Sequence, residues 1–151
     1  MLALRNLRVL VVEDDPELAR TVERSLAHYG HRTVIAGSVA ATAALSDSFD
    51  CGILDIDLPD GSGVQLAETL LDRGQIGAVV FFSASSDPAT LADAREIGLF
   101  VAKTAGVREL ERAVAEAVSE AARQVAGSEP VSSHPRRRSK SGTRRKTTGP
   151  R

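Results

Sequence analysis

The feature that most constrains this chain is the alternation of short apolar runs with longer segments of helical periodicity. Each run spans four to six residues and is rich in aliphatic or aromatic side chains, which is typical of strands buried on both faces. Five strands alternating with five helices predict a parallel sheet covered on both sides, since parallel strands need crossover connections. The expected strands are Leu7–Val12, Thr33–Ala36, Cys51–Asp55, Ala78–Ser83 and Leu99–Ala102.

The helical segments have residues suited to begin and end them. Asp15, Ser38 and Asp87 can each cap a helix through a side-chain oxygen, and Gly30 can end the first one. A turn-forming loop is expected at Leu58–Gly63. The first expected helix lies between Asp15 and Gly30. The other four are expected at Val39–Leu45, Val64–Leu71, Pro88–Ile97 and Val107–Ala126.

The net charge of −1 conceals an uneven distribution along the 151 residues. Residues 1–126 contain 11 Lys and Arg against 19 Asp and Glu, a net charge of −8, and form the expected globular domain. Residues 127–151 contain eight Lys and Arg against Glu129 alone, a net charge of +7. Because this segment has no apolar periodicity and is dominated by small and basic residues, we expect a disordered tail.

Nothing in the sequence predicts a membrane segment or an oxidising compartment. The longest apolar stretch, Ile76–Phe82, is far shorter than the ~20 residues that span a bilayer. The first ten residues contain two arginines and no continuous apolar segment, so no secretory signal is expected. Cys51, expected in the core, is the single cysteine. It cannot form an internal disulfide, which favours a reducing, cytoplasmic setting.

Polar side chains follow four of the five strands at their carboxyl ends, where the functional groups of a parallel sheet gather. Converging carboxylates repel one another, and a hard divalent cation such as Mg²⁺ relieves that repulsion. A lysine and a hydroxyl opposite such a site suit a phosphoryl group, and an aspartate can form an acyl phosphate. The residues concerned are Glu13, Asp14, Asp15, Asp55, Ser83 and Lys103.

Four sequence pieces in this order resemble the receiver domains of two-component response regulators, including the stand-alone CheY-like ones. They are VLVVEDD at 9–15, LDIDLPDGSG at 54–63, FFSAS at 81–85 and GLFVAK at 98–103. The resemblance covers about residues 7–126. It implies a doubly wound α/β fold of the flavodoxin-like type, with a five-stranded parallel sheet in the order 2-1-3-4-5 and five helices.

The resemblance also implies a role for each matching position. Asp55 corresponds to the phosphoacceptor, and Lys103 to the lysine that binds the phosphoryl group. Glu13, Asp14, Asp55 and the backbone carbonyl of Asp57 correspond to the Mg²⁺ ligands. Ser83 and Phe100 hold the positions of the switch hydroxyl and the switch aromatic residue.

One position departs from the family pattern. The family lysine is usually followed by a proline in a cis peptide, whereas Thr104 follows Lys103 here. A non-proline cis bond costs about 2.5–4 kcal/mol, so we expect a trans peptide, or a strained cis one held by the fold. His28 and His31 flank the helix-ending Gly30 and are expected at the surface, and neither has metal-ligand partners nearby.

The function implied is that of a phosphoacceptor signalling protein whose only chemistry is its own phosphorylation and dephosphorylation. A sensor histidine kinase or a histidine phosphotransfer protein would donate to Asp55, and a downstream protein would contact the switched surface, with homodimerisation also possible. One alternative is an interaction module that is never phosphorylated.

The basic tail leaves three interpretations open: a solvated extension, association with the acidic body, or an adaptor that binds nucleic acid or another polyanion. The polyanion contacts would come from Arg136, Arg137, Arg138, Lys140, Arg144, Arg145 and Lys146.

Overall fold

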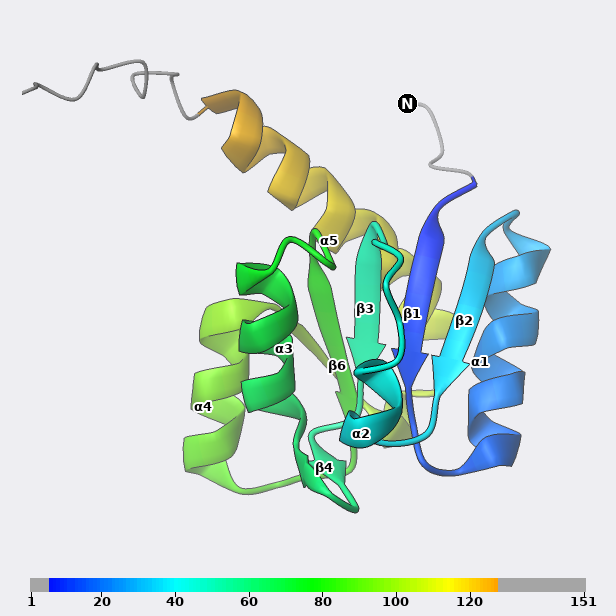
Figure 1. The fold of residues 1–151 in the computed structure, drawn as a ribbon, viewed down its shortest axis with the longest axis vertical. Helices are drawn as coiled ribbons and strands as arrows, with labels where there is room; N and C mark the ends of the chain where they lie inside the picture. Colours follow the sequence, from blue (N-terminus) through cyan, green and yellow to red (C-terminus); the bar gives the residue numbers. More distant parts are fainter. Residues whose placement is uncertain (1–5, 128–151) are drawn as a thin grey trace, which may run out of the picture.

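The computed structural model describes residues 6–127, and within them a five-stranded parallel sheet is flanked by helices (Figure 1). The sheet has the order β2-β1-β3-β6-β7, which confirms the expected 2-1-3-4-5 arrangement. Its strands are β1 (Arg8–Val12), β2 (Arg32–Ala36), β3 (Cys51–Leu54), β6 (Val79–Ser83) and β7 (Leu99–Ala102). The predicted basic tail lies, from residue 128 onward, outside the described residues.

The helices cover both faces of this sheet. In Figure 1, α2 and α3 lie in front of the sheet and α5 lies behind it, with its last turns projecting past the amino ends of β3 and β6. None of the helices among residues 6–127 is both long and apolar enough to cross a membrane. The helices are α1 (Pro16–His28), α2 (Val39–Thr42), α3 (Gly63–Asp72), α4 (Pro88–Ile97) and α5 (Arg108–Gly127), with a 3₁₀ turn, η1, at Lys103–Ala105.

The period-two alternation of the strands divides the core into two clusters. In β1, Val9 and Val11 point to the α1 and α5 side, whereas Leu10 and Val12 point to the α2, α3 and α4 side. All four side chains are buried, which explains why this strand has no polar face. Cys51 packs in the first cluster, as expected.

The expected helix ends are confirmed for the capping residues. The Asp15 carboxylate accepts from the backbone N–H groups of Glu17 and Leu18, and the Ser38 hydroxyl accepts from that of Ala41. Past α1, Gly30 adopts φ +85°, a conformation that favours glycine.

Two local expectations need correction. The second helix was expected over Val39–Leu45, but regular helix ends at Thr42 because the following turn uses i→i+3 bonds, from the N–H of Leu45 to the Thr42 carbonyl among them. The loop expected at Leu58–Gly63 contains a small antiparallel hairpin, formed by β4 (Asp57–Leu58) and β5 (Gly61–Ser62).

The expectation that His31 lies at the surface is wrong. Its side chain is buried at the amino edge of the sheet, with Nδ1 accepting from the backbone N–H of Leu7 at 3.3 Å. Its Nε2 lies 3.8 Å from Oε2 of Glu111 in α5. Two of its contacts, Leu7 and Glu111, lie far from it in the sequence, so the local sequence does not reveal the burial. His28 is exposed, as expected.

Candidate functional site

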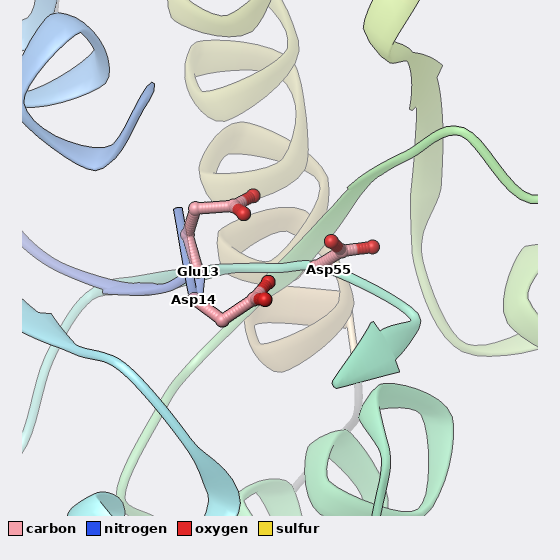
Figure 2. Close-up of side chains that lie close together, drawn as sticks. All are labelled: Glu13, Asp14 and Asp55. Carbon is pink, nitrogen blue, oxygen red and sulfur yellow. The ribbon is translucent and has the colours of Figure 1, made fainter. Parts of the chain in front are cut away.

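Three carboxylates meet at the carboxyl edge of the sheet, where β1 and β3 end (Figure 2). Glu13 and Asp14 follow β1 and Asp55 follows β3, and the two strands are hydrogen-bonded neighbours. Carboxylate oxygens of all three residues lie within 4.8 Å of one another. Glu13 and Asp55 are 4% and 6% exposed, so two of the three negative charges are withdrawn from water.

Asp55 is the centre of the hydrogen-bond network in this site. Its Oδ1 accepts from the Ser83 hydroxyl at 2.7 Å and from the backbone N–H of Asp57 at 3.2 Å. Its Oδ2 accepts from the Lys103 ammonium at 2.8 Å. Ser83 is fully buried at the end of β6, and Lys103 directly follows β7, so four strands contribute to one constellation.

Lys103 joins the two buried carboxylates. Its Nζ lies 3.0 Å from Oε1 of Glu13 as well as 2.8 Å from Oδ2 of Asp55. Partial desolvation alone would lower the pKa of Lys103, but the hydrogen bonds and charges of Asp55 and Glu13 outweigh it and raise that pKa. The ammonium therefore stays charged and compensates the negative charge of the site.

The peptide after Lys103 is trans, as is every peptide bond of residues 6–127. The side chain of Lys103 nevertheless reaches Asp55, so threonine in place of the usual proline does not displace it. This confirms the trans expectation, and the departure from the family pattern takes no group away from the site.

The acidic cluster fits a hard divalent cation by the chemistry of its donors. All three side chains offer carboxylate oxygens, which are the ligands that Mg²⁺ prefers. The buried Oε1 of Glu13 has the Lys103 ammonium at 3.0 Å as its partner, and a carboxylate oxygen with two lone pairs can accept a further contact. Burial raises the pKa of Glu13 more than its hydrogen bonds from Asp15 and Lys103 lower it, as expected of a carboxylate whose compensating charge is incomplete.

Two features that the sequence did not reveal place the β4–β5 hairpin and the start of α3 close to neighbouring backbone. The first is Gly63, where an added Cβ would lie 1.9 Å from the Asp55 carbonyl oxygen. The second is Asp60, whose carboxylate accepts from the backbone N–H groups of Val39 and Ala40 at 2.8 and 2.9 Å. The sequence held one indication of the Gly63 contact, since a glycine directly follows Ser62, the residue that caps α3.

Phe100 is separated from the carboxylates and lies in β7, half-buried against the second core cluster. The Arg95 guanidinium of α4 lies 5.4 Å from the centroid of its ring, a cation–π distance. Of the predicted site residues in the described part of the chain, Glu13, Asp14, Ser83 and Lys103 thus lie around the carboxylate of Asp55, whereas Phe100 does not. The predicted polyanion contacts of the tail lie outside the described residues. The side chain of Asp57 is exposed, and its backbone N–H contacts Asp55.

Residues 9–115 match the model of the response regulator receiver domain. The chain belongs to this family. A receiver domain is the phosphoacceptor module of two-component signalling, so the function expected from the sequence is confirmed at the level of the family.

Curated relatives of this receiver include the transcriptional regulatory protein DpiA of Escherichia coli K12, 33% identical over 98 residues. Another is the transcriptional regulatory protein KdpE of Mycobacterium tuberculosis H37Rv, 34% identical over 106 residues. These alignments cover 62% and 67% of this chain but only 43% and 46% of the relatives, so the matched part is less than half the length of either regulator.

Solved structures agree on the fold. A CheY-like receiver domain protein of Methanospirillum hungatei superimposes with a TM-score of 0.71 at 20% identity, covering 79% of this chain and 98% of that one. The N-terminal domain of a response regulator/sensory box/GGDEF protein of Carboxydothermus hydrogenoformans gives 0.67 at 28% identity, covering 78% and 98%.

Proposed function

We propose that this receiver accepts a phosphoryl group on Asp55 and thereby alters a surface that a partner protein contacts. The observation that carries the proposal is the convergence of the Ser83 hydroxyl and the Lys103 ammonium on the Asp55 carboxylate, at 2.7 and 2.8 Å. A hydroxyl donor and a cation beside one buried carboxylate are the groups that an aspartyl phosphate needs around it.

The donor in this proposal is a phosphohistidine of a sensor histidine kinase or a histidine phosphotransfer protein. One oxygen of Asp55 forms a bond to phosphorus while the bond between phosphorus and the imidazole nitrogen breaks, and that nitrogen keeps the electron pair. Lys103 neutralises negative charge on the phosphoryl oxygens, and the site positions the reacting atoms. The chain acts on no external substrate and catalyses only its own phosphorylation and dephosphorylation.

Glu13, Asp14, Asp55 and the backbone carbonyl of Asp57 would hold Mg²⁺ in this site. When bound, the ion would supply positive charge opposite the transferred phosphoryl group, which carboxylates alone would repel. The carboxylate oxygens of Glu13, Asp14 and Asp55 that lie within 4.8 Å of one another support this assignment.

Ser83 and Phe100 form the proposed switch. Ser83 donates to Asp55 in the structure described here and would donate to a phosphoryl oxygen after transfer. Phe100 would then move toward the space that Ser83 leaves, which would change the surface formed by α4, β7 and α5. The new charge-assisted contacts bias the population toward this second state.

The cellular setting belongs to the same proposal. The receiver would be located in the cytoplasm, where it would bind its histidine kinase and then contact a downstream protein. Homodimerisation, and nucleic-acid contact through the residues beyond 127, stay predictions.

The proposal is tested by intact-mass measurement after incubation with acetyl phosphate and with a phosphorylated histidine kinase, each with Mg²⁺ or with EDTA. We expect one phosphoryl group on the protein with Mg²⁺, none with EDTA, and none on Asp55→Ala. Asp57→Ala is the matched control, since it removes a neighbouring carboxylate but keeps the backbone carbonyl. Equal labelling of Asp55→Ala would reject Asp55 as the acceptor, and an unlabelled wild type would favour an interaction module.

A further inference from the structure

A groove of about 480 Å³ lies at the amino edge of the sheet, opposite the carboxylate cluster. It runs between the C-terminal parts of α4 and α5, over the beginnings of β6 and β7. Its floor is apolar and is lined by Ala78, Val79, Ile97, Leu99, Ala117 and Ala121. The phosphoacceptor chemistry uses none of these residues.

The rim of this groove is acidic. Glu96 of α4 and Glu116 and Glu120 of α5 line it, and all three are exposed. Two arginines partly offset this charge, since Arg95 also lines the groove and Arg123 pairs with Glu120. The guanidinium of Arg95 lies 5.4 Å from the centroid of the Phe100 ring, a cation–π distance.

The part of the chain beyond residue 127 begins beside this groove. Gln124 lines the groove, and α5 ends three residues later at Gly127. Residues 128–151 contain eight Lys and Arg against Glu129 alone, and one large aliphatic residue, Val131. An extended chain spans about 3.3–3.6 Å per residue, so a few residues suffice to return from Gly127 over the rim.

We propose that residues 128–151 dock in cis along this groove, with their basic side chains at Glu96, Glu116 and Glu120 and Val131 against the apolar floor. A single exposed ion pair contributes little, but the attachment at Gly127 makes the effective concentration of the segment high, on the order of millimolar. The charges are opposite in sign, and their attraction is sensitive to salt. Docking does not depend on phosphorylation of Asp55, so it can fail while the proposed function holds.

Carbodiimide cross-linking of the full chain tests this docking, because the chain contains only three lysines. Lys140 and Lys146 belong to the segment, and Lys103 is in the carboxylate cluster. We expect amide cross-links from Lys140 or Lys146 to the three rim glutamates at low salt. Glu68 on α3 and Glu109 at the start of α5 are equally exposed and serve as reference carboxylates. Cross-links spread evenly over the references and the rim, or absent from the rim, would overturn the proposal.

A charge variant separates docking from chance proximity. In Glu116→Gln combined with Glu120→Gln, the cross-link yield at the remaining Glu96 should fall about fivefold, because two attractive charges are lost. Glu68→Gln combined with Glu109→Gln should leave that yield unchanged. An unchanged yield in the first variant would contradict the proposal.

Mixed ¹⁴N and ¹⁵N chains identify which molecule supplies the segment. Cross-linked peptides should carry one isotope only if docking occurs in cis. Peptides that combine both isotopes would show that a second copy occupies the groove, and would overturn the proposal as stated.

Discussion

The two edges of the parallel sheet differ in whether their charged side chains are buried or exposed. At the carboxyl edge, Glu13 and Asp55 are buried and share the ammonium of Lys103. At the amino edge, the glutamates of the α4–α5 groove are exposed. Burying charge costs free energy that paired geometry only partly returns, so the carboxyl edge gives up stability for a reactive arrangement. Exposed charges cost little, and their effect is a long-range attraction.

The largest expected effect concerns the glycines that allow close backbone approach at each edge. Gly63→Ala would place a Cβ 1.9 Å from the Asp55 carbonyl oxygen, and Gly98→Ala would place one 2.3 Å from the carbonyl of Val79. Neither backbone can yield easily, so we expect each variant to lose about 3 kcal/mol of unfolding free energy in urea titrations. Gly37→Ala is the control, since its Cβ would be 4.0 Å from the nearest atom.

The same two glycine variants sharpen the comparison when phosphoryl labelling is measured. Gly63→Ala should lose labelling in its folded fraction, because the clash lies on the backbone of Asp55 itself. Gly98→Ala should keep it. Equal labelling of both variants would show that the two edges do not differ in the way described.

The next effect concerns the cation of the carboxyl edge. Lys103→Met leaves Glu13 and Asp55 buried without their shared counter-ion, and we expect a loss of about 2 kcal/mol in unfolding free energy. This lies below the range for fully buried pairs, because the side chain of Lys103 is 24% exposed. Arg8→Met is the control, since its ion pair with Asp47 is at the surface. Equal losses in the two variants would contradict the comparison.

The pH dependence of stability without metal gives a smaller effect. The pKa of Glu13 is raised from its usual 4.5, chiefly by burial. Between pH 4.5 and the higher pKa of the folded state, the folded protein therefore binds a proton that the unfolded chain does not. In EDTA, the unfolding free energy should therefore fall as pH rises above about 4.5 through the pKa of the folded state. Glu13→Gln should flatten this part of the profile, and an unchanged slope would show that another group is responsible.

The smallest effect is expected at the exposed edge. Glu116→Gln replaces a carboxylate that has water on most sides, so urea titration should show a change within about 0.5 kcal/mol. A loss comparable to that of Lys103→Met would mean that the groove depends on its charge for folding.

Sequence reasoning predicted the sheet and its carboxyl edge for a physical reason. An apolar run that ends in a charged or hydroxyl residue predicts both the strand and the polar side chain at its carboxyl end, as at Asp55 and Ser83. The burial of His31 was missed because its partner Leu7 lies 24 residues away in the sequence. The contact of Gly63 with Asp55 was missed because it depends on how closely two backbone segments approach. The second helix was predicted too long because its alanines also suit the i→i+3 turn that replaces its end.

The length of α5 has a mechanical consequence. Its first half is buried through Leu110 and Val114, whereas its last turns project past the sheet (Figure 1). At about 1.5 Å per residue, its 20 residues measure about 30 Å. Because the first half is held in the core, a tilt of about 5° in the remaining half, about 15 Å long, would displace its end by about 1.3 Å.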